Sequence, residues 1–539
     1  MPTGAELFAR TIVSLGVQRI FTLVGDHLNE VLAELDRAGV EIIHMRHESG
    51  VAHAADAYAR IERKPAIALV TGGPGHTNAL TGLATAHLAC SPLVLVSGSR
   101  ASILAGRQSF QDIDQVAMAR PASKLAAEVV SPSQIPFQLH RAFSEASSGR
   151  KGAVHLTIPL DVFQANTNIQ DTPPQPPFGD PAPNCEDLRR AAGMLRAAER
   201  PVVIAGSGVW WAGAGDLLQQ FIEATNLPLY TITMARGVVS DDHPLCFGFA
   251  DPALNRAALR VFAEADLFLV LGKRLDYRLA FGGPRVLPKQ ARVIQADIHA
   301  AELGLNRTVD VAICADVAAT IRALHAECAT IPKRDEWLQR NGQARREWQD
   351  VISAAMTEDG LPMHPAVVYR ELLKAMPTDA LLSWDGGDFT HWGRAIMPAR
   401  QPGGWLRLGP LGTIGSALPN AIALRLARPD RPVFLITGDG SLGFYLAEME
   451  TAVRYELPIV LIVGNDAGWG IERELQTAQG TLSSSGATVA CELRRTRYDL
   501  VMKGFGGDGE HVEHPDEIAP AITRALASAV PYCIDITVR

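Results

Sequence analysis

Apolar and polar positions along this chain form blocks that predict short buried strands and amphipathic helices in turn. In the first third, continuous apolar runs are separated by segments with apolar residues three and four positions apart. The runs lie at 19–24, 42–44, 66–71, 93–97 and 153–158, and the helical segments at 5–15, 28–38 and 50–60. Strands that alternate with helices predict an α/β layer with a mostly parallel sheet.

The same alternation continues in two further blocks. Predicted strands lie at 201–205, 267–271 and 293–297 in the middle of the chain, and at 380–384, 433–436, 458–463 and 532–538 in the last part. The chain shows no short-period repeat. Two similar large α/β segments do flank a third, which suggests two related layers that can face one another.

Changes in composition mark the domain boundaries. Residues 166–183 are rich in Pro, Gln, Asp and Thr, and proline fixes φ and removes a donor, so we expect an extended linker. Residues 332–361 are charged and helical, which is typical of a solvated connecting helix. We therefore expect domains at 1–165, 184–331 and 362–539.

Composition narrows the class of protein. A chain of 539 residues, 47% of them hydrophobic, is long enough for about three domains. A net charge of −8 argues against a nucleic-acid partner. There is no uncharged apolar run long enough for a membrane span, the N-terminal helix has no cleavable apolar region, and the final strand leaves no tail to cover a pocket. The seven scattered cysteines contain no CxxC and indicate free thiols in a reducing cytoplasm.

A strand–helix–strand unit at 433–469 carries acidic and amide oxygens at the ends of both strands. Gly438-Asp439-Gly440-Ser441 reads as a tight polar loop, and Asn465-Asp466 follows the second strand. A crossover helix places the ends of parallel strands side by side, so Asp439 and Asp466 should converge. Hard oxygen ligands suit Mg²⁺ held together with phosphates, and the glycines let backbone N–H groups approach them. Gly-Asp-Gly alone is more often only a turn, but the full unit predicts a magnesium-bridged diphosphate site.

This GDGS stretch, followed by an Asn-Asn-like pair, closely resembles the thiamine-diphosphate motif. The resemblance covers nearly the whole chain and is to the superfamily of acetolactate synthase, benzaldehyde lyase and 2-hydroxyacyl-CoA lyase. It implies an α/β fold of three domains, pyrimidine-binding, central Rossmann-like and diphosphate-binding, each a mostly parallel sheet flanked by helices. The chain departs from the pattern at Asp466, where the family has asparagine. That change keeps an oxygen ligand and adds a negative charge, and we expect Mg²⁺ binding to survive it.

Glu48 lies in RHESGVAHAADAYAR, at the start of a predicted helix. On its own, a carboxylate favoured by the helix dipole explains it equally well. The resemblance implies that Glu48 hydrogen-bonds the aminopyrimidine ring, which favours the imino tautomer whose nitrogen takes the thiazolium C2 proton. It also implies that Gly412 accepts from the 4′-amino group and that Ile414 wedges between the two rings. A bulky apolar side chain suits a wedge because it leaves no polar atom unsatisfied, although Ile414 can equally be a core residue.

Other stretches resemble the family's cofactor and substrate contacts. The Gly/Pro-rich loop 71–78 suggests Pro74 and Asn78 as cofactor contacts, with His76 incidental. Gly387 would contact the diphosphate through its backbone. Asp388 is an awkward acid beside phosphate, so hydrogen bonding outward is the alternative for its side chain.

Three side chains are candidates for the substrate side of the site. His27 can relay a proton to a carbonyl or hydroxyl, or be only a helix-start histidine. Gln111 can orient a carbonyl, with Phe110 bounding the pocket. Trp469 can cap the acceptor site or be a packing anchor.

The predicted site residues fall into four sets. The catalytic set is Glu48, His27 and Gln111. The cofactor-binding set is Gly25, Glu48, Pro74, Asn78, Gly387, Asp388, Gly412, Ile414, Gly438, Asp439, Gly440, Ser441, Asp466, Gly468, Trp469 and Gly470. The metal set is Asp439, Asp466 and Gly468, and the substrate set is His27, Phe110, Gln111 and Trp469.

The resemblance implies thiamine-diphosphate-dependent formation or cleavage of C–C bonds in 2-keto acids or 2-hydroxy ketones, through ylid and enamine intermediates. A 2-hydroxyacyl-CoA lyase or oxalyl-CoA-type decarboxylase stays open, with the acyl-CoA held near Gly206–Gly208 and Lys273-Arg274. FAD or ADP in the central domain also stays open, because a GxG turn is weak evidence. A non-catalytic cofactor-binding or regulatory protein is a further alternative, disfavoured by the intact Glu48, Asp439 and Ile414. Because the family builds its sites between subunits, we expect a homodimer or homotetramer.

Overall fold

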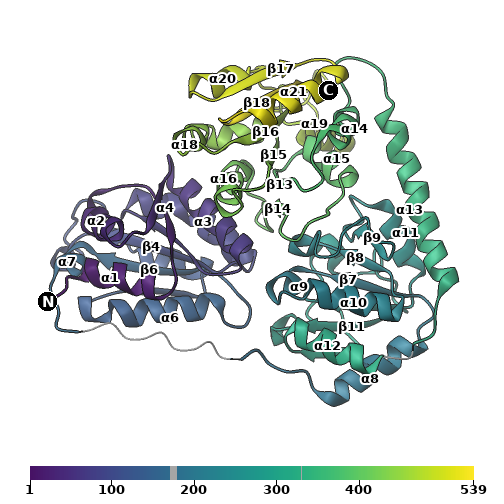
Figure 1. Cartoon of the computed structure of the whole chain (residues 1–539), viewed down its shortest axis with the longest axis horizontal. Helices are drawn as coiled ribbons and strands as arrows, with labels where there is room; N and C mark the ends of the chain where they lie inside the picture. Colours follow the sequence, from purple (N-terminus) through teal and green to yellow (C-terminus); the bar gives the residue numbers. More distant parts are fainter. Residues whose placement is uncertain (170–178, 329–330) are drawn as a thin grey trace.

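The computed structural model describes residues 1–169, 179–328 and 331–539, and it contains three domains, each built on a six-stranded parallel sheet flanked by helices. Figure 1 shows the first domain (purple to blue) and the central domain (teal) side by side, with the third domain (green to yellow) above them. The predicted α/β fold of three domains is confirmed. Half of the predicted linker 166–183 lies outside the described residues, so the exact domain boundaries stay predictions.

The first domain has its sheet in the order β2-β1-β3-β4-β6-β5. Its strands are β1 Arg19–Thr22, β2 Glu41–His44, β3 Ala66–Val70, β4 Leu93–Ser99, β5 Leu125–Glu128 and β6 Val154–Pro159. Its helices are α1 Gly4–Ser14, α2 Asn29–Arg37, α3 Glu48–Glu62, α4 Pro74–Leu88, α5 Gln115–Ala119, α6 Ile135–Ser147 and α7 Leu160–Gln164. The central strands are wholly buried, which explains their continuous apolar runs.

The third domain repeats this topology, with the order β14-β13-β15-β16-β18-β17. Its strands are β13 Leu381–Trp384, β14 Trp405–Arg407, β15 Val433–Gly438, β16 Ile459–Asn465, β17 Asp508–Val512 and β18 Tyr532–Thr537. Its helices are α14 Pro365–Ala375, α15 Asp388–Ile396, α16 Ala417–Ala427, α17 Asp439–Leu442, α18 Glu448–Arg454, α19 Gly470–Gln479, α20 Tyr498–Gly504 and α21 Pro515–Ala527. The two related layers inferred from the sequence are therefore present.

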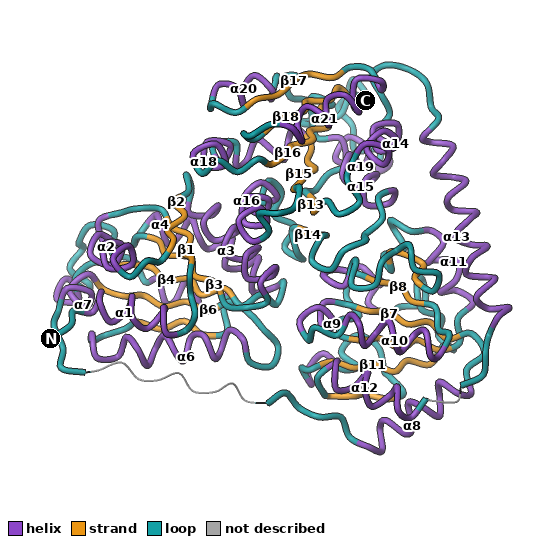
Figure 2. Tube along the Cα trace, in the orientation of Figure 1, coloured by secondary structure: helices purple, strands orange, loops and turns teal. Residues whose placement is uncertain are grey.

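The central domain differs, because its sheet order β12-β11-β10-β7-β8-β9 is the doubly wound order of Rossmann-like folds. Its strands are β7 Pro201–Ala205, β8 Leu229–Thr231, β9 Cys246–Phe249, β10 Leu267–Leu271, β11 Arg292–Asp297 and β12 Val311–Cys314. Its helices are α8 Cys185–Ala197, α9 Ser207–Trp211, α10 Gly215–Thr225, α11 Arg256–Glu264 and α12 Val317–Glu327. The long helix α13 Asp335–Met356 then runs up one side of the molecule to the third domain (Figure 2).

Two predicted loops are wrong in part, because each helix begins earlier than expected. Gly438 is the last residue of β15, and the short helix α17 starts at Asp439, so GDGS is a strand end followed by a helical turn. Likewise α4 starts at Pro74, which places Asn78 within the helix. Proline is well suited to the first helical turn because the backbone N–H groups there have no acceptor within the helix, so proline loses no hydrogen bond.

Within the described residues, no helix combines the length and apolar character needed to cross a bilayer. All seven cysteines are free thiols, as the sequence predicts.

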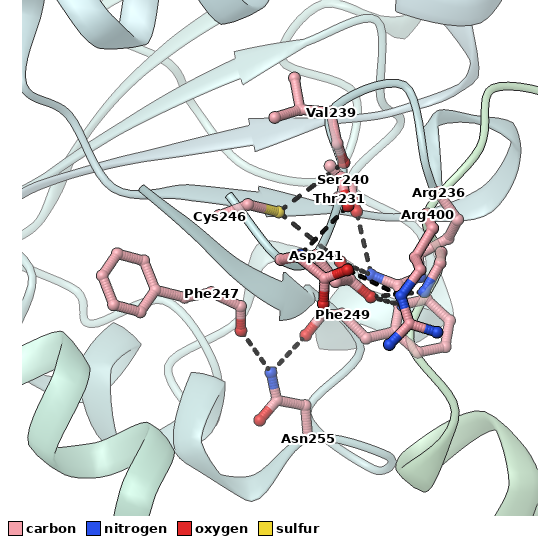
Figure 3. A network of polar contacts seen from close by, with 12 residues as sticks. Thr231, Arg236, Val239, Ser240, Asp241, Cys246, Phe247, Phe249, Asn255 and Arg400 are labelled. Carbon is pink, nitrogen blue, oxygen red and sulfur yellow. Dashed lines mark hydrogen bonds and ion pairs between the residues drawn. The ribbon is translucent and has the colours of Figure 1, made fainter. Parts of the chain in front are cut away.

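A buried ion pair of the central domain, Arg236 with Asp241, contacts the third domain (Figure 3). Arg236 donates to both carboxylate oxygens of Asp241, and its guanidinium stacks between the rings of Phe249 and Trp405, 4.9 and 5.0 Å from their centroids. Asp241 also accepts from the backbone N–H of Ala399 at 2.8 Å. The adjacent pair, Asp242 with Arg400, spans the same junction but is exposed.

We expect Asp241→Ala to cost about 3–5 kcal/mol of unfolding free energy, because Arg236 would be left buried without its partner. The matched change Asp242→Ala should cost less than about 1 kcal/mol, since exposed pairs are screened by water. Urea denaturation followed by tryptophan fluorescence measures both. Equal losses of unfolding free energy in the two variants would contradict the conclusion that the buried pair contributes more to stability than the exposed one.

Candidate functional site

The predicted residues of the first domain gather at the carboxyl edge of its sheet. Glu48 begins α3 directly after β2, and Asn78 on α4 donates to its Oε2 at 2.9 Å. A Cβ placed on Gly75 would lie 3.4 Å from Glu48 Oε1, so the turn that starts α4 packs against the carboxylate. Pro74 is exposed on the same turn. The structure thus fixes the half-buried Glu48 from two sides of one helix end.

His27 lies beside this cluster and is held in one neutral form. Its Nδ1 accepts the backbone N–H of Gly72 at 3.2 Å and lies 2.8 Å from the hydroxyl of Thr71. Burial lowers the pKa of His27, so the ring is neutral near pH 7. Because Nδ1 accepts, the proton of the neutral ring is on Nε2.

The remaining first-domain candidates lie around the same loops. A Cβ on Gly25 would lie 2.5 Å from Thr71, and one on Gly73 would lie 2.7 Å from the Cβ of Gln111, so these backbones approach closely. Phe110, by contrast, is 78% exposed and is not among the residues that line the pocket of the predicted metal residues, described next. The structure therefore brings Gln111 near His27 but leaves Phe110 on the surface.

The third domain carries the predicted metal residues at its own carboxyl edge. Asp439 Oδ2 accepts the N–H of Gly468 at 3.1 Å, and the Tyr498 hydroxyl donates to the Asp439 carbonyl at 3.0 Å. Burial, with the neighbouring Asp466 carboxylate, raises the pKa of Asp439. The side chain of Asn465 points away and donates to Asp535 and to a backbone carbonyl. Asp466, not Asn465, therefore faces Asp439.

One pocket unites most of the predicted diphosphate and metal residues. It is lined by Gly387, Asp388, Gly438, Asp439, Gly440, Ser441, Asp466, Gly468, Trp469 and Gly470, together with neighbours from the third domain. None of its lining residues comes from the described part of the first domain. Burial, then Glu474 and Asp466, raises the pKa of Asp388 to about 7. Asp388 lines the pocket, and its role as a cofactor contact or as an acid that hydrogen-bonds outward stays a prediction.

The residues fit a divalent cation with a diphosphate. The carboxylates of Asp439 and Asp466 lie close together and repel each other, so a cation between them would be stabilising. Carboxylate oxygens are also the ligands that Mg²⁺ prefers. A Cβ on Gly440 would lie 2.8 Å from the ring of Trp469, so a side chain there would fill the cradle. Trp469 also packs edge-on against Phe444, which supports its role as a packing anchor.

A buried carboxylate that the sequence prediction missed holds the loops around this pocket. Asp385 accepts from the N–H groups of Gly386 and Gly415 at 2.8 and 2.9 Å, and from the Thr437 hydroxyl at 3.1 Å. Gly415 belongs to the stretch that carries Ile414, and a Cβ on Gly386 would lie 2.7 Å from Ile414. Ile414 therefore lies against Gly386, at the start of the loop Gly386-Gly387 that is predicted to contact the diphosphate. Gly412 has a φ of +74° and is exposed, with its carbonyl in a turn that favours glycine.

A second cavity, of about 1280 Å³ including space open to solvent, lies between all three domains. Its lining includes Ser207, Gly208, Lys273 and Arg274, the residues proposed from the sequence as a nucleotide site. Lys273 is buried and paired with Asp276, and Arg274 donates to a backbone carbonyl of the first domain.

Glu448 on α18 is another residue that the sequence analysis missed. Its carboxylate is 1% exposed and accepts the N–H of Arg46, at 3.2 and 3.3 Å to its two oxygens, and the hydroxyl of Thr451 at 2.6 Å. A Cβ on Gly50 would lie 2.5 Å from its Oε1, so a larger residue at this position in the first turn of α3 would displace the carboxylate. Glu448 thus caps the chain that leads into Glu48, from the third domain.

Burial raises the pKa of Glu448 to about 7, which makes native stability depend on pH. Between about pH 4.5 and 7 the folded state keeps a proton that the unfolded chain loses, so rising pH lowers wild-type stability. Glu448→Gln carries no such proton. We expect its stability relative to wild type to rise by about 1 kcal/mol per pH unit across this window, measured by urea denaturation. A difference that stays flat from pH 5 to 7 would contradict the raised pKa. Glu450→Gln, on the same helix, is the matched control for a lost carboxylate.

Comparison with known sequences identifies all three domains. Residues 2–118 match the thiamine pyrophosphate enzyme N-terminal TPP binding domain, residues 188–324 the central domain, and residues 385–536 the C-terminal TPP binding domain.

Curated relatives align along nearly the whole chain. A probable acetolactate synthase of Mycobacterium bovis is 35% identical over 537 residues, covering 99% of this chain and 95% of the relative. A 2-hydroxyacyl-CoA lyase 2 of Caenorhabditis elegans is 32% identical over 578 residues, covering 98% and 87%. A 2-hydroxyacyl-CoA lyase of Oryza sativa subsp. japonica is 30% identical over 558 residues, covering 99% and 95%.

Proposed function

The chain belongs to the thiamine pyrophosphate enzyme family, and from that premise we propose that it joins or cleaves C–C bonds of 2-keto acids or 2-hydroxy ketones. One observation carries the proposal. Two sheets of the same topology each present a polar cluster at the carboxyl edge, Glu48 with Asn78 on one and Asp439 with Asp466 on the other. These clusters match the two ends of thiamine diphosphate.

We assign the diphosphate end to the third domain. Asp439, Asp466 and the Gly468 carbonyl would hold Mg²⁺, and the backbone of Gly387 and the start of α17 would contact the phosphates. When bound, thiamine diphosphate supplies a carbon nucleophile and an electron sink for the bond beside the carbonyl.

We assign the proton chemistry to the first domain. Glu48, fixed by Asn78, would hold a proton against the aminopyrimidine ring and so control its tautomer. His27, with its proton on Nε2, can donate to a substrate oxygen, and Gln111 can orient that oxygen. Ile414 would set the bend between the rings.

We propose a homodimer or homotetramer in which each site takes Glu48 from one chain and Asp439 from another. The lining of the metal pocket supports this, because it contains residues of the third domain only among those described. Apolar side chains that a lone chain leaves exposed also support it, namely Phe110, Phe444 and Leu411. The free and partly exposed thiols support a cytoplasmic location.

A thioester substrate is the second candidate, and the large cavity favours it. The cavity includes Gly409 and Pro410, which begin the stretch carrying Gly412 and Ile414, so a nucleotide held there would lie next to the cofactor end. Several cationic side chains line it, including Arg150, Lys151 and Arg407, and CoA and FAD both carry phosphates that such groups bind. The relatives named acetolactate synthase keep 2-keto acids as our first choice.

We expect Glu48→Gln to bind thiamine diphosphate and yet to slow H/D exchange at the thiazolium C2 at least about 100-fold, because its proton transfer is lost. Nuclear magnetic resonance of quenched samples measures the exchange. Asp439→Ala is the matched control and should lose cofactor binding itself. Exchange that does not depend on Glu48 would support a non-catalytic cofactor-binding protein instead.

Product formation from pyruvate, benzoin and a 2-hydroxyacyl-CoA, assayed side by side, discriminates the substrate classes. We expect turnover of pyruvate or benzoin. Turnover of the thioester alone would replace our first choice with the acyl-CoA lyase.

A further inference from the structure

Arg473 binds the one residue that departs from the family's metal pattern. It lies in the first turn of α19, and its Nη1 is 3.0 Å from Asp466 Oδ2 while its Nη2 donates to the Asp466 carbonyl at 3.1 Å. The side chains are 25% and 16% exposed, so the pair is largely shielded from water. On its far side, Arg473 reaches Glu492, which is 69% exposed and therefore a weak competitor.

Two glycines of the metal loop make room for this pair. A Cβ on Gly468 would lie 1.7 Å from Arg473 Nη2, so the guanidinium lies directly against the backbone of a predicted ligand. A Cβ on Gly470 would lie 2.7 Å from Asp466 Oδ2. The loop is thus shaped around an acid and an arginine together, and a larger residue at either position would displace one of these two side chains.

The charges around the predicted metal site indicate what the Asp466–Arg473 pair can do. Asp439 and Asp466 place two negative charges where a metal and an anionic diphosphate must both bind. A second carboxylate attracts the cation but repels the diphosphate. A fixed arginine beside it returns the local charge to that of a neutral amide while the carboxylate oxygen stays available as a ligand.

We propose that Arg473 is the counter-charge of the anionic metal ligand Asp466, and that it balances cation affinity against diphosphate affinity in this chain. The inference rests on the cofactor site proposed above. Arg473 is a positioning residue here, because it acts through Asp466 and not on a reacting atom.

The affinities for Mn²⁺ and for thiamine diphosphate should change in opposite directions, and this tests the role of Arg473. Both are measured on full-length protein that has been freed of cofactor by chelation and dialysis. Mn²⁺ binding without thiamine diphosphate is followed by electron paramagnetic resonance. Binding of thiamine diphosphate at saturating Mg²⁺ is followed by the intrinsic tryptophan fluorescence of the protein, to which Trp469, whose ring packs on Gly440, contributes.

We expect Arg473→Met to tighten Mn²⁺ binding several-fold and to weaken thiamine diphosphate binding about tenfold. Asp466→Asn should weaken Mn²⁺ binding about tenfold, because it removes one carboxylate and leaves Arg473 beside the cation with only the exposed Glu492 as a charged partner. The double variant, which has the same local net charge as wild type, should return both affinities to within about threefold of wild type. Arg473→Lys, which keeps the charge, should also stay within about threefold.

A loss of Mn²⁺ affinity in Arg473→Met, or a double variant whose affinities stay far more than about threefold from wild type, would overturn the proposal while leaving the cofactor site standing. If wild type bound neither Mn²⁺ nor thiamine diphosphate, or if Asp439→Ala kept Mn²⁺ binding, the proposed function would fail as well. Glu492→Gln, on the exposed side of Arg473, is the matched control and should leave both affinities unchanged. Circular dichroism of each variant establishes that it is folded.

Discussion

The buried carboxylate of Asp385 is the interaction on which the cofactor end of the third domain depends. It is 1% exposed and accepts hydrogen bonds from Gly386, Gly415 and Thr437. These three residues lie on the diphosphate loop, the Ile414 stretch and the strand that leads to Asp439. Burial raises the pKa of Asp385 to about 6, which is the cost of removing a carboxylate from water, and the three donors offset it. The Asp385 side chain therefore holds these three segments next to one another.

Repetition of one topology explains why the two clusters exist at all. In both outer domains the chain leaves parallel strands at the same edge, so short polar loops there collect side chains that are far apart in sequence. The third domain also reaches the first, because Glu448 and Tyr445 bind the chain around Glu48. The segment that follows Asp439 is thereby linked to the residues on either side of Glu48 in the same chain. If sites are shared between chains, this contact connects two different active sites.

The sequence predicts the strong elements of this fold and misses the weak ones. The buried strands β3, β4, β15 and β16 have continuous apolar runs, whereas the missed strands β5, β8, β9, β12, β14 and β17 are short, and all but β8 lie at sheet edges. The motif residues of the site were visible because the family pattern is local. Asp385 and Glu448 were not, because their partners lie 30 and 402 residues away and only folding brings them together. Arg473 had a signal, since an unusual acid precedes it by seven residues at the start of a helix.

The central claim is that Glu48 and Asp439 serve one cofactor from different chains. Co-expression of Glu48→Gln with Asp439→Ala tests it most directly, because each variant alone should be inactive. We expect the mixture to recover about a quarter of wild-type activity, since half of randomly assorted dimers are mixed and each mixed dimer has one intact site. Activity no higher than that of the single variants would contradict the shared site.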